Sequence, residues 1–391
     1  MIYNLMSGNE IIDNQELKEL KNIFTKSKGV LFAHGFDLRR NNIFRTKIFE
    51  KNFRKYLKCK YAVSCSSGTA AGTIALMALG IGKGDEVIVQ SFTFIAAIES
   101  ILMTGAKPVI VDTDNTLGMC PKDLQKKITK KTKCIMPVHM LGKSCNMDEI
   151  KKVSKLKKIP IIEDACEALG VKYKNKFIGT LGEMGFFSFD FGKIITTGEG
   201  GMVTTNNKNL YTKLKALRDH GHENKSNIHR GLDKAICRGF NFRMTEMQAA
   251  VGIAQLKKLK KILYLKERNF KIIEKKLLEK KLIQLRKSNS GSSDQHDFLC
   301  LVFPNKILAK RVYLKFVKQK IPVGILPVAK KWHFAGDWGH LWKNDIRYSK
   351  SYKRMWSNSK NLLDRTISIP ISIKSSKKMI LRNVEKILNI I

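Results

Sequence analysis

Short apolar runs alternate with stretches of helical periodicity over the first half of the chain, and this alternation is the main guide to the fold. Seven runs are predicted as β-strands, at residues 61–64, 86–90, 108–112, 134–139, 160–163, 185–189 and 202–205. Helices are expected at residues 70–79, 96–104, 121–128, 147–156 and 209–217. Several strands are continuously apolar, as in strands buried on both faces. The pattern predicts an α/β fold with a mainly parallel, seven-stranded sheet flanked by helices.

Two further features concern the end of this alternating region. Residues 185–189 and 202–205 are too close for a helical crossover, so we expect one antiparallel pair between these strands. A long helix is predicted to begin at Thr245, because Thr245 and Gln248 have the spacing of a capping box.

A second, smaller unit is predicted after the long helix. A polar loop at residues 288–294 is followed by strands near residues 298–303 and 367–369, which indicates an α+β arrangement. We therefore expect a large domain at residues 1–260, including an N-terminal helical segment, and a small C-terminal domain at residues 261–391.

The composition is that of a globular protein with an apolar core. Of the 391 residues, 43% are hydrophobic. No apolar run reaches the length of about 18 residues that a membrane helix needs, and the first ten residues lack the pattern of a secretory signal. The eight cysteines include no CxxC pair. We expect a cytoplasmic protein with reduced cysteines, no membrane span and no bound metal.

The formal net charge of +40 raises the question of an anionic partner. The basic residues are spread along the whole chain, whereas a nucleic-acid-binding surface requires them to cluster. We therefore expect a lysine-rich surface without nucleic-acid binding, although a positive field would still attract an anionic substrate. A regulatory or nucleic-acid-binding protein remains the alternative from a different functional class.

Lys193 differs from the other lysines, because it follows an apolar run and precedes a glycine-rich turn. Burial penalises the ammonium form of a lysine, and a neutral amine is a nucleophile that can form a Schiff base. The alternative from this segment alone is a lysine whose charged end reaches solvent at the end of a strand.

Other residues just past predicted strand ends complement this amine. Asp164 follows an apolar strand, where a carboxylate can pair with a protonated pyridine nitrogen or cap a helix. Ser67, Gly68 and Thr69 open a predicted helix, whose amides point toward an anion. Phe94 follows the next strand and can stack on a flat ring or belong to the core. An amine, an acid, a phosphate cradle and a stacking ring together describe a pyridoxal 5'-phosphate site.

The chain resembles the DegT/DnrJ/StrS family of sugar aminotransferases between about residues 49 and 265. The motifs that carry this resemblance are YAVSCSSGT at 61–69, GDEVIV at 84–89, GAKPV at 105–109, PVH at 137–139, EDA at 163–165, TTGEGG at 196–201 and NFRMTE at 241–246. The resemblance implies the fold-type-I aminotransferase architecture and pyridoxal 5'-phosphate as cofactor.

The resemblance also implies roles for individual residues. Lys193 would form the Schiff base with the cofactor, Asp164 would pair with its ring nitrogen, and Phe94 would stack on its ring. The residues implied for the phosphate are Ser67, Gly68, Thr69, Ser188 and, from the second subunit of a homodimer, Asn241. Many members have glutamine or histidine where this chain has Glu167, so Glu167 is a departure; we place it near the cofactor's hydroxyl group.

A narrower resemblance concerns the substrate. Stretches at residues 36–41, 188–193, 219–222 and 332–338 are similar to those of members that aminate a free Kdo-type sugar acid of lipopolysaccharide. The predicted substrate is therefore 8-oxo-3,8-dideoxy-manno-octulosonate, giving 8-amino-Kdo. The candidate substrate residues are Arg40, Arg45, His220, His222, Trp332 and His333. An arginine would bind the carboxylate through its planar fork, or lie on the surface without that role.

The implied reaction transfers an amino group from an amino acid, expected to be L-glutamate, to the sugar carbonyl, with Lys193 moving the proton. Two related functions remain open. A nucleotide-sugar aminotransferase would use the same core with a different pocket for the substrate. A sugar 3-dehydratase of the family has histidine at the position of Lys193, so the lysine favours amination.

Overall fold

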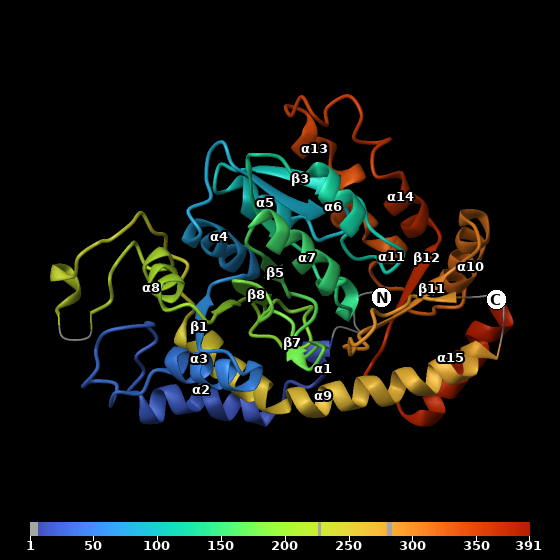
Figure 1. The fold of residues 1–391 in the computed structure, drawn as a ribbon. Helices are drawn as coiled ribbons and strands as arrows, with labels where there is room; N and C mark the ends of the chain where they lie inside the picture. The colour runs from blue at the N-terminus through green and yellow to red at the C-terminus, as the bar shows by residue number, and fades with distance from the viewer. Residues whose placement is uncertain (1–6, 226–227, 280–283) are drawn as a thin grey trace.

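The computed structural model describes residues 7–225, 228–279 and 284–391 (Figure 1). The strands in these ranges are β1 (Tyr61–Cys65), β2 (Glu86–Gln90), β3 (Lys107–Val111), β4 (Thr132–Met136), β5 (Ile162–Asp164), β6 (Lys172–Tyr173), β7 (Lys176–Phe177), β8 (Met184–Ser188), β9 (Gly201–Thr205), β10 (Gln284–Leu285), β11 (Phe298–Val302) and β12 (Thr366–Pro370). The α-helices are α1 (Ser7–Glu10), α2 (Asn14–Lys26), α3 (Arg45–Leu57), α4 (Gly68–Ala78), α5 (Ala96–Leu102), α6 (Pro121–Lys127), α7 (Met147–Lys157), α8 (Lys208–Leu217), α9 (Glu246–Leu278), α10 (Lys306–Lys318), α11 (Ile325–Val328), α12 (Lys330–His333), α13 (Gly339–Trp342), α14 (Ser357–Asp364) and α15 (Lys377–Ile390).

Seven strands form the central sheet. Backbone pairing gives the orders β1-β9-β8-β5 and β3-β2-β4, and two parallel bridges, Ile135 with Ile161 and Val138 with Asp164, connect β4 to β5. The strand β9 runs antiparallel to both of its neighbours, β1 and β8, while the other pairs are parallel. The mainly parallel sheet and the antiparallel pair of β8 and β9 are therefore confirmed.

Both faces of this sheet are covered, as the continuously apolar strands predicted. In β2, Val87 and Val89 belong to an apolar cluster that includes residues of α4 and α5. The residue between them, Ile88, belongs to a second cluster that includes residues of α3, α7 and α9. Successive side chains of a strand point to opposite faces, so one apolar run supplies both clusters.

The long helix α9 joins the central sheet to a smaller three-stranded sheet, β10-β11-β12, packed with α10 and α15. Thr245 and Gln248 form the predicted capping box at its start. The helix is unbroken from Glu246 to Leu278 and runs along one side of the molecule (Figure 1). The domain boundary at residue 260 stays a prediction, placed within this continuous helix.

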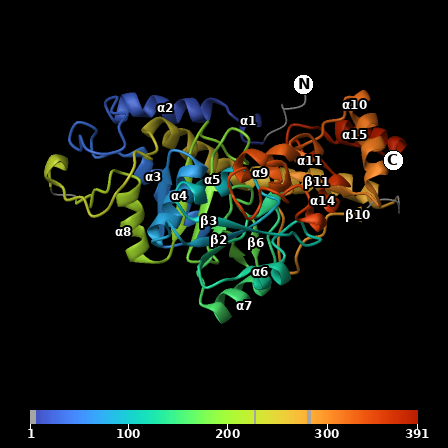
Figure 2. The same cartoon turned by 90° about the horizontal axis from the view of Figure 1, so that it is seen from above.

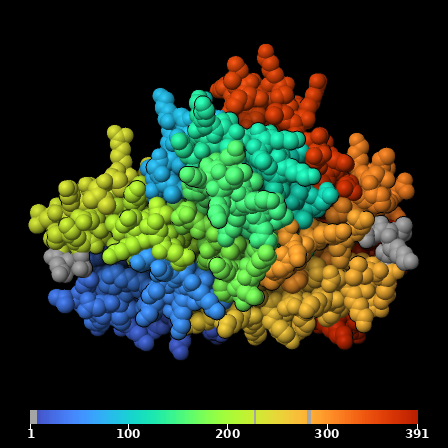
Figure 3. Space-filling model, viewed as in Figure 1, coloured from blue at the N-terminus to red at the C-terminus, as the bar shows by residue number. Residues whose placement is uncertain are grey.

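The N-terminal segment packs on the same long helix. The helix α2 lies alongside α9 in both cartoon views (Figure 1, Figure 2). Lys258 of α9 donates through Nζ to the Ile11 carbonyl and to Glu16 Oε2, at 2.7 Å each. The N-terminal segment and the segment that follows α8 lie next to each other at one end of the molecule, coloured blue and yellow-green in Figure 3. Within the described ranges, no helix has the length and apolar character to cross a membrane.

Candidate active site

The predicted cofactor residues lie at one edge of the central sheet. Asp164 ends β5 and Ser188 ends β8, two neighbouring parallel strands. Gly68 begins α4 two residues after Ser66, which follows β1. Because ligands of open α/β sheets bind at the carboxyl ends of the strands, this edge is where a cofactor is expected.

The start of α4 forms a cradle that suits a phosphate. Ser67 caps the helix, accepting from the Ala70 amide at 3.1 Å. A Cβ on Gly68 would lie 2.8 Å from the Ser188 Cβ and 3.1 Å from its Oγ, so only glycine lets the helix start come this close to the Ser188 hydroxyl. Thr69 follows, half-buried. Backbone amides at a helix start and nearby hydroxyls are the donors that an anion requires.

The Lys193 amine faces a carboxylate. Its Nζ lies 3.4 Å from Glu167 Oε1, and Glu167 Oε2 accepts from the Leu141 amide at 2.9 Å. Burial alone would lower the pKa of Lys193, but the charge of Glu167 and its neighbours outweighs burial, so the pKa is raised above 10.5. Burial would raise the pKa of Glu167, yet Lys193 and His333 keep it below 4.5. The pair is an ammonium and a carboxylate.

Asp164 is placed to hold a protonated ring nitrogen. Its carboxyl is buried, and its Oδ1 accepts from the Cys166 amide at 3.0 Å. Burial raises the pKa of Asp164 above 3.8. A cation bound beside this carboxylate would offset the cost of burying its charge, which is what a pyridinium nitrogen supplies. The residues at this edge therefore fit pyridoxal phosphate.

Phe94 and His333 form a wall from two distant parts of the chain. Their ring centroids are 5.2 Å apart, and the Phe94 ring is 42% exposed. The segment of α12 docks here through backbone hydrogen bonds, from the Thr93 amide to the His333 carbonyl and from the Ile95 amide to the Trp332 carbonyl. His333 Nδ1 donates to the Ala329 carbonyl at 2.8 Å. Phe94 thus has an open face for a ring, and His333 lies at the site, whereas the Trp332 side chain is exposed.

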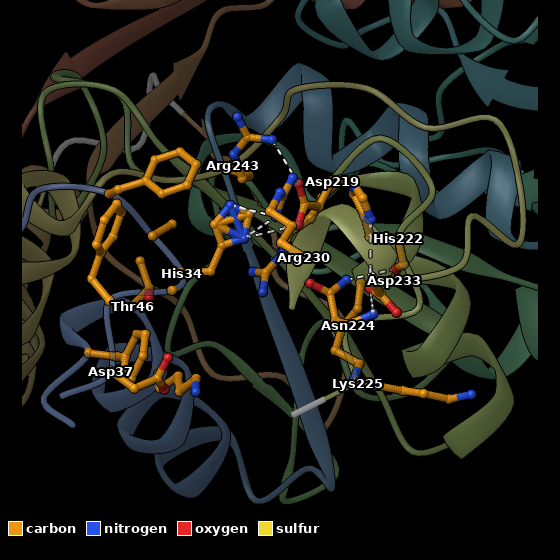
Figure 4. Close-up of a pocket in the computed structure, with 18 of the residues that line it drawn as sticks. His34, Asp37, Thr46, Asp219, His222, Asn224, Lys225, Arg230, Asp233 and Arg243 are labelled. Atoms are coloured by element: carbon orange, nitrogen blue, oxygen red, sulfur yellow. Dashed lines mark hydrogen bonds and ion pairs between the residues drawn. The ribbon is translucent and has the colours of Figure 1, made fainter. Parts of the chain in front are cut away.

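A separate cavity of about 940 Å³ lies between the N-terminal segment and the segment that follows α8 (Figure 4). Of the candidates, His222 lines this cavity and is 3.6 Å from Asp233. His220 has a left-handed backbone and is exposed. Asn241 is also exposed, and its backbone forms a bridge with Asp219.

A network around Asp219, not anticipated from the sequence, forms one wall of the cavity. Arg230 donates to both Asp219 oxygens, at 2.6 and 2.8 Å, and Arg243 Nη1 to Oδ1 at 2.7 Å. His34 of the N-terminal segment lies 3.2 Å from the same carboxylate. Burial, countered by Asp219 but reinforced by the arginines, lowers the pKa of His34 to about 4, so His34 is neutral near pH 7. These four residues lie far apart in the sequence, so no local motif could have indicated the network.

Arg40 and Arg45 each pair with a carboxylate of the chain itself. The Arg40 guanidinium is fully buried, with Nη2 2.6 Å from Glu246 Oε2 and Nη1 donating to the Phe32 carbonyl. Arg45 Nη1 is 3.0 Å from Glu19 Oε2, and its backbone amide donates to Glu246. Both guanidinium groups are thus occupied within the chain. Across the described residues, no cluster of three histidine, cysteine, aspartate or glutamate side chains is suited to a metal ion.

Comparison with known proteins identifies the family. The model of the DegT/DnrJ/EryC1/StrS aminotransferase family matches residues 42–388. The chain belongs to this family. The predicted family and fold are thereby confirmed.

The chain is similar to several characterised members of this family. GDP-perosamine synthase of Caulobacter vibrioides is 45% identical over 230 residues, which are 59% of this chain and 61% of that protein. The chain thus aligns with about three fifths of the length of this relative.

Solved structures of other proteins share the fold of this chain over nearly its whole length. An aminotransferase from Psychrobacter cryohalolentis has 27% identity and a TM-score of 0.86, covering 97% of each chain. A GDP-4-keto-6-deoxymannose-3-dehydratase with a trapped adduct of pyridoxal phosphate and glutamate has 24% identity and a TM-score of 0.82, covering 98% of this chain and 100% of that one. Family membership confirms pyridoxal phosphate as the predicted cofactor.

Proposed function

We propose that this protein is a pyridoxal-phosphate-dependent aminotransferase that transfers an amino group from an amino acid to a keto sugar linked to a nucleotide. The observation that carries the proposal is the convergence of Lys193, Asp164 and the start of α4 at one sheet edge, in a chain of the aminotransferase family. The amino donor that we propose is L-glutamate.

Each residue of the site would have a separate role in this reaction. When bound, the cofactor supplies a ring that withdraws electrons from the amino-acid α-carbon. Asp164 would keep the ring nitrogen protonated, and the start of α4 with Ser188 would hold the phosphate. Phe94 would stack on the ring. Lys193, once free and neutral, would carry the proton to and from the reacting carbon through its Nζ.

A nucleotide-linked sugar fits better than the free sugar acid predicted from the sequence. The carboxylate clamp for a sugar acid rested on Arg40 and Arg45, and both guanidinium groups are bound inside the chain. The similarity to a GDP-perosamine synthase supports a nucleotide sugar instead. The net charge of +40 is suited to attract such an anionic substrate.

Amination is also favoured over dehydration. The fold is shared with a GDP-4-keto-6-deoxymannose-3-dehydratase, so architecture alone does not separate the two reactions. The identity of residue 193 favours amination, because the sugar 3-dehydratases that the family resemblance brings in have histidine at that position. A lysine amine both attaches the cofactor and returns to it after each half of the transfer.

We further propose a homodimer in which the segment near Asn241 reaches the partner's cofactor. The support is a group of exposed apolar residues just before Asn241 in the sequence, Ile228, Leu232, Ile236 and Phe240. Light scattering on the purified protein tests this directly, since a monomer at micromolar concentration would contradict it. All eight cysteines are free, which suits the cytoplasmic location that we propose.

The experiment that tests the substrate class compares acceptors in one assay. The purified protein, pyridoxal phosphate and L-glutamate are incubated with GDP-4-keto-6-deoxymannose, with a uridine-linked keto sugar and with the free Kdo-type keto acid. Mass spectrometry detects the aminated product. We expect amination of a nucleotide-linked sugar at least tenfold faster than of the free acid. Preference for the free acid would overturn the nucleotide proposal and restore the sugar acid.

A further inference from the structure

The carboxylate of Glu167 has two partners of different kinds. Its Oε2 accepts from the Leu141 backbone amide at 2.9 Å, and its Oε1 faces Lys193 Nζ at 3.4 Å. The amide contact fixes the position of the carboxylate and does not depend on a full negative charge. The contact with Lys193 is the one in which the charge matters, because an ammonium is stabilised by an anion.

The backbone that anchors Glu167 is itself held in place. Leu141 has a left-handed conformation, with φ of 55° and ψ of 38°, and its side chain is buried. Arg286 donates through Nη1 to the Met140 carbonyl at 2.8 Å, and the Gln295 amide donates to the Gly142 carbonyl at 2.9 Å. The Leu141 amide is therefore a fixed donor, and the carboxylate that it binds has a defined place.

Several titratable groups surround Lys193, and among them Glu167 is in direct contact with its Nζ. Asp164 is the last residue of β5, and burial raises the pKa of its carboxyl. Cys166 and Asp190 also raise the pKa of the Lys193 amine through their electrostatic interaction with it. On the side of α12, burial lowers the pKa of His333, so this imidazole adds no positive charge near pH 7. Among these groups, Glu167 is the one for which a direct contact with Nζ is observed.

Glutamine at this position would serve the structure nearly as well. Its amide oxygen has the reach to accept from Leu141, and its volume is almost the same as that of glutamate. What glutamine cannot supply is a charge. Because the contact with Lys193 is the one that requires a charge, the glutamate points to a function for the charge and not for the hydrogen bond alone.

We propose that Glu167 is the counter-ion of Lys193 and sets the pH at which the lysine nitrogen loses its proton. Glu167 is a positioning residue in this account, acting on the reaction through Lys193. The same charge would favour a proton on that nitrogen when it is joined to the cofactor. This role does not depend on which sugar is aminated.

Two measurements without any sugar test the proposal. In the full chain without cofactor, competitive acetylation across a pH series, analysed by peptide mass spectrometry, gives the midpoint at which Lys193 becomes reactive. In the loaded protein, the pH dependence of the bound cofactor's absorbance reports the proton on the linked nitrogen. The variants are Glu167→Gln and, as a matched control, Glu199→Gln, which removes a charge from an exposed side chain.

We expect both midpoints to fall by about one to three pH units in Glu167→Gln, the usual effect of losing an adjacent opposite charge. The control should retain the wild-type midpoints. Glu167→Asp keeps the charge on a shorter side chain and should lie between the two, which preserves the test if the glutamine variant folds poorly. Unchanged midpoints in a folded Glu167→Gln protein would overturn the proposal, while leaving the proposed sugar amination untouched.

Discussion

Replacing Glu163 with glutamine tests the buried framework on which Asp164 rests. The two residues are consecutive in β5, so their side chains point to opposite faces of the sheet. The Glu163 carboxylate is fully buried and accepts from the amides of Gly179, Leu181 and Gly182, at 3.0, 2.6 and 2.8 Å. It thereby joins β5 to the turn that leads into β8.

A histidine completes this framework. His139 Nε2 lies 3.3 Å from Glu163 Oε2, while its Nδ1 accepts from the Cys145 amide at 3.0 Å. His139 and Glu163 thus form a buried electrostatic contact. Glu163 thus accepts from three backbone amides, and both of its oxygens are used.

Glutamine has nearly the same shape but replaces one oxygen with an amino group. In its better orientation the amino group would face the Gly179 amide and the His139 ring, leaving the amide without an acceptor and the ring without its charged partner. An unpaired buried donor costs about 1–3 kcal/mol, and breaking a buried charged contact costs about 3–5 kcal/mol in total. We therefore expect Glu163→Gln to lower the free energy of unfolding by about 3–5 kcal/mol.

Urea denaturation followed by circular dichroism measures this loss. The matched control is Glu183→Gln, because Glu183 is exposed and directly follows the turn that Glu163 binds. The control should change stability by less than about 0.5 kcal/mol, as most surface substitutions do. A Glu163→Gln protein as stable as the control would refute the view that this carboxylate supports the site.

Three further outcomes follow from the site. Gly68→Ala should push Ser188 away by steric contact and weaken cofactor binding at least tenfold in a fluorescence titration; wild-type affinity would argue against the phosphate cradle. Asp164→Asn should bind the cofactor but lose more than a hundredfold in turnover, and near-normal turnover would remove its role at the ring nitrogen. Because burial lowers the pKa of His333 below 6.5, folded protein resists its protonation. The free energy of unfolding should therefore fall as the pH drops below 6.5, and it should fall less in His333→Gln. Urea denaturation of both proteins across this pH range measures the difference. Parallel curves for the two proteins would exclude a contribution from His333.

The fold was largely predictable because the decisive signals are local. A parallel strand that is covered on both faces is apolar there, and residues 87–89 of β2 and 134–136 of β4 are such runs. The spacing of β8 and β9 also excluded a helical crossover. By contrast, the hairpin of β6 and β7 has two residues in each strand, too few for any period to be recognised.

The candidate site was predictable only in part, for the same reason. Lys193, Asp164 and Gly68 lie next to strand ends and in compact motifs, so topology brings them together. The pairing of the Arg40 guanidinium with Glu246 was not predictable, because the two residues lie far apart in the sequence. The docking of His333 beside Phe94 likewise depends on how the last part of the chain packs. Long-range pairing of charges leaves no periodic trace in a sequence.

The transfer of labelled nitrogen tests the central claim most directly. The purified protein is loaded with pyridoxal phosphate and given glutamate that carries heavy nitrogen, together with GDP-4-keto-6-deoxymannose or the best nucleotide-linked acceptor. We predict that mass spectrometry will find one heavy nitrogen in each aminated sugar, and none when Lys193→Ala replaces the wild-type protein. A sugar product without heavy nitrogen, or an equal rate from a folded Lys193→Ala protein, would contradict the assignment of this site as an aminotransferase centre.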